Sequence, residues 1–179
     1  MFKETVELRN KLVVLEQERV LKTREVFDGK KGSFAEALEI IKAESGILTL
    51  LRLRLGDDKK GTAKSRESLE VKLKEIGSSR KVPDAVRSGL NVALANADNH
   101  VECMSKFVDA MEGALRITRS NLTRYKKGLA IKKDPTPYLD AAQKYLAEDE
   151  TCLNNVVESM WAIFVDSEKL GEAILTGQI

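Results

Sequence analysis

The sequence offers few side chains of the kinds that carry out chemistry. His100 is the only histidine, so a serine or cysteine triad, or a histidine-containing metal site, would have to use it. Its acidic neighbours Asp98 and Glu102 alternate with it along a predicted helix, and side chains two residues apart on a helix diverge. We therefore expect His100 to lie partly exposed on a helix flank. We predict a non-enzymatic protein with no catalytic site, no metal, no cofactor and no small-molecule substrate.

The two cysteines, Cys103 and Cys152, show neither a CxxC motif nor a spacing typical of metal ligands. We expect both thiols to be buried and reduced, as in a cytosolic protein.

The strongest charge pattern is a run of cations. No Asp or Glu lies between Gly113 and Lys133. In the last helix, by contrast, most charged residues are acidic. The run predicts a surface for an anionic partner, made of Arg116, Arg119, Arg124, Lys126, Lys127, Lys132 and Lys133. Nucleic acid, an anionic membrane or an acidic protein would each suit such a surface. The alternative is a solvated helix end whose cations offset the helix dipole.

A second candidate surface is apolar. Four large side chains of the last helix lie off its regular apolar seam, namely Val157, Trp161, Phe164 and Val165. We expect that they either pack under an N-terminal helix or form a partner surface, with self-association as the main competitor.

These side chains belong to two predicted long helices. Apolar residues recur at steps of three and four from Val86 to Leu129, with Thr118 as the polar exception. A continuous helix of this length would measure roughly 65 Å. A second stripe of small and apolar residues beside the first favours a bundle over a two-stranded coiled coil. Gly113 and the alanines beside it predict the close approach of a neighbour.

The last helix is expected to begin near Tyr138, after the helix-breaking Pro135 and Pro137. The short connection predicts an antiparallel helical hairpin over 84–176. Three helices are expected within 1–77, with Asp57–Gly61 as a loop. In the first helix Val6, Val13, Val20 and Phe27 are seven residues apart, with Leu8, Leu12 and Leu15 beside them. The sequence thus predicts an all-α, elongated up-down helical bundle of about five helices, forming a single domain over 1–179.

Composition agrees with this fold class. Charged residues make up 32% and aromatic residues only 5% of the chain, and the formal net charge is +2. No apolar run reaches the length of a membrane span, and the first seven residues alternate charged and apolar types, unlike a signal peptide. We expect a cytoplasmic protein, with secretion as the alternative.

Two short segments resemble a known family. Cys103–Glu112 is similar to the third-cysteine helix of the plant invertase and pectin methylesterase inhibitors, and Glu150–Asn155 is similar to their fourth-cysteine segment. The resemblance implies a secreted four-helix bundle that inhibits an enzyme by direct contact, with Cys103 and Cys152 oxidised as a pair. The family's first cysteine pair has no counterpart within residues 1–80. If the hairpin turns near Asp134, Cys152 lies opposite Ile117, roughly 20 Å along the axis from Cys103, beyond disulfide reach.

The function expected from the sequence is therefore binding through protein contacts, as an adaptor, chaperone-like or scaffold module whose partner the sequence does not name. The alternatives are a nucleic-acid or anionic-membrane binder that uses the cationic run, and an inhibitor-like four-helix protein.

Overall fold

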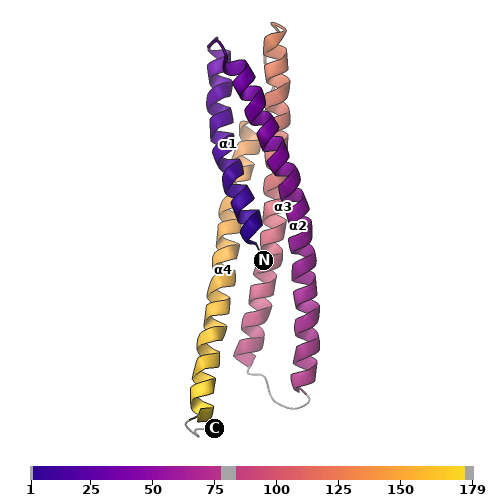
Figure 1. Cartoon of the computed structure of the whole chain (residues 1–179), viewed down its shortest axis with the longest axis vertical. Helices are drawn as coiled ribbons and strands as arrows, with labels where there is room; N and C mark the ends of the chain where they lie inside the picture. Colours follow the sequence, from indigo (N-terminus) through magenta and orange to yellow (C-terminus); the bar gives the residue numbers. More distant parts are fainter. Residues whose placement is uncertain (1, 78–83, 176–179) are drawn as a thin grey trace. The chain divides into compact units, whose positions relative to one another are not determined.

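In the computed structural model, which describes residues 2–77 and 84–175, all regular structure is helical. The helices are α1 (Lys3–Phe27), α2 (Ser33–Gly77), α3 (Asp84–Lys126) and α4 (Thr136–Leu175) (Figure 1). The all-α prediction is confirmed. The chain forms two compact units: unit 1 is Met1–Asp58 with Met104–Leu146, and unit 2 is Lys59–Cys103 with Ala147–Ile179. No helix in the described ranges is both long and apolar enough to span a bilayer.

The described part of the chain has four helices, so the prediction of about five was wrong. The expected loop at Asp57–Gly61 is helical, and α2 continues through it. A glycine in a helix costs about 1 kcal/mol relative to alanine, which weakens a helix without breaking it as proline does. In unit 1, the buried Asp58 accepts a hydrogen bond from the Thr5 hydroxyl of α1. This tertiary contact holds the segment helical.

The buried residues of α1 are Thr5, Arg9, Leu12, Arg19 and Val26. Four of them, Thr5, Leu12, Arg19 and Val26, form a series one residue before Val6, Val13, Val20 and Phe27, which are only half-buried. Seven-residue spacing is present in both sets, so periodicity alone did not distinguish them. The set with Thr5 and Arg19 is buried because both polar side chains find partners inside unit 1.

Arg19 lies at the centre of a buried polar cluster between α1, α2 and α3. Its Nε is 2.8 Å from Oε2 of Glu44, and its Nη1 donates to the Thr118 hydroxyl at 3.0 Å. Thr118 in turn donates to the Ala114 carbonyl at 3.0 Å. All three side chains are almost fully buried. Thr118, the polar exception in the predicted α3 seam, is therefore where the core accommodates a charged residue.

The predicted seams of α3 are confirmed within unit 1 from Met104 to Leu122, whereas Tyr125 and Leu129, which continue the predicted pattern, are 39% and 49% exposed. Met104, Val108, Met111 and Leu115 are buried, and so are the second-stripe residues Phe107, Ala110, Ala114 and Ile117. The close approach expected at Gly113 is confirmed as well: the Tyr138 ring of α4 packs so tightly there that an added Cβ would lie 2.3 Å from it.

The connection between α3 and α4 differs from the predicted tight corner. α3 ends at Lys126, and Gly128 adopts φ +67°, which closes the helix with hydrogen bonds from Gly128 N to Tyr125 O and from Leu129 N to Arg124 O. The chain then runs back along α3. The Arg124 Nε donates to Ala130 O and the Asn121 Nδ2 donates to Lys133 O, both at 2.7 Å. We call residues 127–135 the return segment.

The glycine at the α3–α4 approach provides a test of this packing. In Gly113→Ala, the new methyl group would overlap the Tyr138 ring, so we expect a loss of about 1–3 kcal/mol in the free energy of unfolding, although alanine favours helices. Gly46→Ala is the matched control, because Gly46 lies inside α2 and a Cβ there meets no atom within 4 Å. That control should gain up to about 1 kcal/mol. Urea denaturation of both variants measures the difference, and equal shifts would contradict the close approach.

The buried carboxyl group of Glu44 predicts a pH dependence. Burial raises the pKa of Glu44 from 4.5 to about 7, although Arg19 beside it acts in the opposite direction. Between these two values the folded chain holds this proton more tightly than the unfolded chain does. This contribution to stability is therefore complete below about pH 4.5 and is lost as the pH rises through about 7.

We expect the free energy of unfolding to fall across this window by on the order of 1–3 kcal/mol more in the wild type than in Glu44→Gln, which cannot titrate. Urea denaturation at a series of pH values measures it. Parallel pH profiles of the two proteins would contradict the assignment.

Candidate binding surfaces

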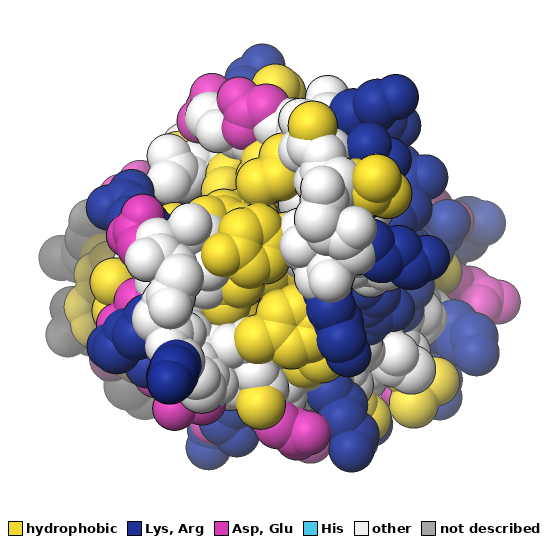
Figure 2. Space-filling view, turned by 90° about the horizontal axis from the view of Figure 1, so that it is seen from above, with side chains coloured by type: hydrophobic (Ala, Val, Ile, Leu, Met, Phe, Trp, Pro, Cys, Tyr) yellow, Lys and Arg dark blue, Asp and Glu magenta, His cyan; other side chains and the backbone are white. Residues whose placement is uncertain are grey.

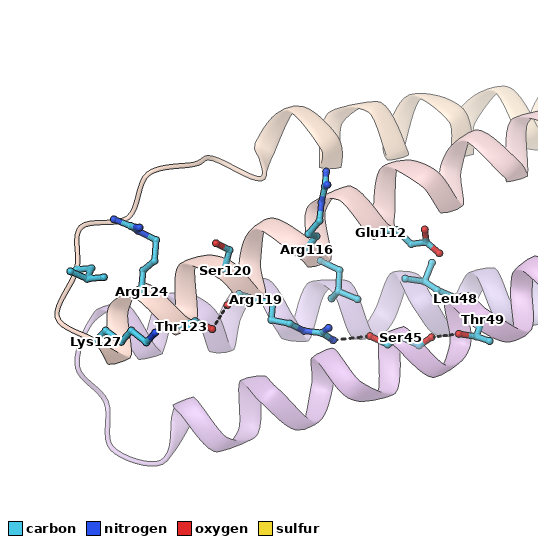
Figure 3. A pocket seen from close by; sticks show the side chains of 12 residues that line it. Ser45, Leu48, Thr49, Glu112, Arg116, Arg119, Ser120, Thr123, Arg124 and Lys127 are labelled. Atoms are coloured by element: carbon cyan, nitrogen blue, oxygen red, sulfur yellow. Dashed lines mark hydrogen bonds between the residues drawn. The ribbon is translucent and has the colours of Figure 1, made fainter.

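Four of the seven predicted cations line one groove between α2 and α3 in unit 1. Arg116, Arg119 and Arg124 of α3 and Lys127 of the turn that follows line this groove, which has a volume of about 690 Å³ (Figure 3). Leu129 is exposed there, while Leu48 and Leu115 line the groove as buried residues. The groove therefore offers a cationic wall beside apolar side chains.

Hydroxyl groups complete the groove. Ser45 and Thr49 of α2 and Ser120 and Thr123 of α3 also line it, with Ser120 and Thr123 nearer to the end of α3 (Figure 3). Arg119 donates to the Ser45 hydroxyl at 3.2 Å, which holds the guanidinium at the α2 side. The sequence analysis missed these hydroxyls. Ser120 and Thr123 could have been found from their helical spacing to Arg116, but Ser45 and Thr49 come from another helix and only the tertiary structure brings them here.

The other three cations lie at or after the C-terminal end of α3 in unit 1. Lys126 sits over the Phe34 ring at 5.4 Å, and the exposed Lys132 and Lys133 belong to the return segment. Lys133 shares a smaller hollow of about 480 Å³ with Arg116. Figure 2 shows one face of the chain, with apolar side chains at its centre and a concentration of Lys and Arg along one side.

None of the seven cations is paired with an acidic side chain among the described residues. The nearby Arg52 behaves differently, because its guanidinium lies 2.6 Å from Asp109 and 2.7 Å from Glu112. The groove cations make contacts of another kind: Arg119 bonds a hydroxyl and Arg124 bonds a backbone carbonyl. No acidic side chain in the described part of unit 1 pairs with them directly, although Glu112, which is bound to Arg52, also lines the groove.

The apolar face of α4, in unit 2, is exposed as the sequence analysis allowed. Val157 is 67% exposed, Trp161 65%, Phe164 53% and Met160 49%. The Trp161 and Phe164 rings stack with their centroids 5.7 Å apart. Val165 is half-buried rather than exposed, so it does not belong to this face. Met160, which is exposed, takes its place. Met160 continues the three-four spacing of apolar residues in the last helix and was therefore expected in its buried seam, but in α4 its side chain is exposed.

Acidic residues border this face along the helix. Glu150 precedes Val157 by two helical turns, and Glu168 follows Phe164 by one turn, so both lie in line with the apolar side chains. Both are exposed. We call the surface formed by Val157, Met160, Trp161 and Phe164, with Glu150 and Glu168 at its ends, the α4 face.

The prediction for His100 was wrong. Its side chain is fully buried in unit 2, where its Nδ1–H donates to Oδ1 of the equally buried Asp149 at 2.5 Å. A polar residue in the seam of α4 needs a partner inside the core, and the histidine of α3 supplies it. Asp149 in the seam was the signal that the sequence analysis did not use.

The cysteine geometry also differs from the expected one. In unit 2, the Cys103 Sγ lies 3.9 Å from Oε2 of Glu148, and the two thiols form a hydrogen bond with each other. The expected offset of roughly 20 Å is wrong because the return segment displaces the start of α4 along α3. Both cysteines are free and half-buried.

A cluster of metal-ligating side chains would be another arrangement that supports chemistry. No three His, Cys, Asp or Glu residues in those ranges converge as metal ligands do. Comparison of the chain with protein-family models, with curated proteins and with solved structures finds no match.

The environment of the thiols predicts a slow reaction. Burial, together with the neighbouring Cys152, Glu148 and Asp149, raises the pKa of Cys103 to about 11. Because the thiolate is the reactive form, we expect the alkylation rate of folded Cys103 to keep rising about tenfold per pH unit between pH ~8 and ~10. In the denatured chain it should level off near pH ~8.5–9. Peptide mass spectrometry after iodoacetamide treatment measures each thiol.

Glu148→Gln is the control, since it removes one carboxylate and should move the Cys103 profile to lower pH. A folded-state profile that coincides with the denatured one would contradict the assigned environment.

Proposed function

We propose that this protein is a non-enzymatic binding module that acts through protein–protein contacts, with the α4 face as its docking surface. The observation that carries the proposal is the exposure of Trp161, stacked on Phe164 and continuous with Val157 and Met160. Soluble proteins seldom expose a contiguous group of large apolar side chains without a partner for it. Tryptophan is also the residue most often found at the energetic centre of protein interfaces.

The chemistry of the face indicates the kind of partner. Glu150 and Glu168 lie at its two ends and are exposed. An amphipathic helix with apolar side chains at its centre and cations at its ends would bury the rings and pair with both carboxylates. An adaptor or scaffold role fits such a surface.

Binding is favoured over catalysis because the polar groups that come together inside the units serve the core. Arg19 bonds Glu44 and Thr118 in unit 1, and His100 bonds Asp149 in unit 2. These contacts bury their charge, whereas a catalytic site must reach its substrate. We extend the proposal to a cytoplasmic location and to one elongated up-down bundle over 1–179, which remain predictions.

A second candidate function is supported by the cations of the unit 1 groove, none of which pairs directly with an acidic side chain in the described part of unit 1. A nucleic acid or an anionic membrane would bind there with a strong salt dependence. Titration with generic DNA and with anionic vesicles at low ionic strength tests it, and lack of binding to both excludes it. For the inhibitor-like alternative, the contact between Cys103 and Cys152 removes the geometric objection, and a thiol count under denaturing conditions tests the pair.

The docking surface can be tested with Trp161, the only tryptophan of the chain. In dilute protein, a helical peptide of Leu and Lys should shift the Trp161 emission to the blue, because binding removes the ring from water. The same peptide with Glu in place of Lys should not, because it would meet Glu150 and Glu168. A matched variant, Glu150→Gln with Glu168→Gln, should weaken the Lys peptide about tenfold. No emission shift with the Lys peptide at any concentration would contradict the proposed function.

A further inference from the structure

The α4 face and the unit 1 groove carry opposite charge and similar form. The α4 face is an apolar strip with a carboxylate at each end, and the groove has a cationic wall beside leucines. We propose that the groove of one copy binds the α4 face of a second copy. This inference rests on the proposed function, because it names the partner of the same docking surface.

The dimensions of the two surfaces agree. From Arg116 to Lys127 the cationic wall extends about 16 Å, at about 1.5 Å per residue, and the apolar part of the α4 face, Val157 to Phe164, extends about 10 Å. The apolar side chains thus fit within the length of the wall. Glu150 and Glu168 are about 27 Å apart, so each lies about 5 Å beyond one end of the wall. An extended Arg or Lys side chain spans that distance.

Charge decides which pairing of the surfaces is favourable. Two α4 faces brought together would place Glu150 and Glu168 of one copy against those of the other. Two grooves brought together would oppose their arginines. Like charges across an interface cost several kcal/mol. Only a face in a groove pairs the carboxylates with cations that have no acidic partner among the described residues of unit 1.

The groove suits a helix better than it suits an extended polyanion. Arg116 and Arg119 are three residues apart, and so are Arg124 and Lys127; carboxylates one turn apart on the face of a second helix have this spacing. Leu129, which is 49% exposed, would meet the apolar strip, while Leu48 and Leu115 line the groove as buried residues. The residues that line the groove include no aromatic ring on which a base could stack. Tyr125, which lies near it on α3, packs its ring edge-to-face against Phe27 at 5.4 Å.

Such a contact joins the groove of one copy to the α4 face of another, which are two different surfaces. If each copy docks its face in the groove of the other, the contacts close a dimer; if docking is one-way, they build longer assemblies of copies. In either case the association should depend on protein concentration and weaken as salt rises.

The test uses the full chain and two charge-reversed variants of exposed residues. In the groove variant, Arg116 and Arg119 are replaced by Glu. In the face variant, Glu150 and Glu168 are replaced by Lys. Sedimentation velocity from micromolar to millimolar concentration should show association of the wild type. Each variant alone should associate with an affinity lower than that of the wild type by about tenfold or more. Circular dichroism and thermal unfolding should show that both variants remain folded.

The decisive sample is the equimolar mixture of the two variants. The lysines of the face variant now oppose the glutamates of the groove variant, so association should be restored to near the wild-type level. A wild type that remains monomeric up to millimolar concentration, or a mixture that associates no better than its components, would overturn the inference. The emission shift of Trp161 with the Lys peptide is read separately, so the proposed function can stand when this inference fails.

Discussion

The register between α3 and α4 depends on how the chain leaves α3. Gly128 adopts a left-handed conformation that ends the helix, and the side chains of Asn121 and Arg124 bind the carbonyls of Lys133 and Ala130. The chain is thereby led back along α3 before α4 begins. The contact of Tyr138 with Gly113 in unit 1 follows from this path. In unit 2, the pairs His100–Asp149 and Cys103–Glu148 have the matching register.

Buried polar contacts mark the places where the apolar pattern is interrupted. Thr118 interrupts the seam of α3, and it accepts from the buried Arg19. Asp149 interrupts the seam of α4, and it accepts from the buried His100. A buried charge is costly unless it is paired, and removing one member of a buried pair costs about 3–5 kcal/mol. Each pair therefore disfavours other packings of helices whose apolar seams alone are interchangeable, because a different register would leave a charge without a partner.

The arrangement of charged and aromatic side chains on the surface is not explained by the packing of the core. Groove cations in unit 1 have no acidic partner among the described residues, although Arg52 close by has two. The α4 face of unit 2 exposes aromatic rings between carboxylates. Exposed rings and cations without a direct acidic partner contribute little to the stability of a folded chain. The proposed role in binding would account for these side chains.

The sequence by itself determined the all-α class, the long α3 and α4 and the close approach at Gly113, because helical periodicity and proline positions are local properties. It predicted seven cations as one surface, and only the tertiary structure places four of them along a groove with α2. It did not determine that α2 continues past Gly56 and Gly61, that Arg19 faces the core, or that His100 is buried against Asp149. Those outcomes depend on Asp58, Glu44 and other partners distant along the chain. The tertiary structure alone decided them, because the free energy of a buried polar side chain depends on which partner the fold brings within hydrogen-bonding distance.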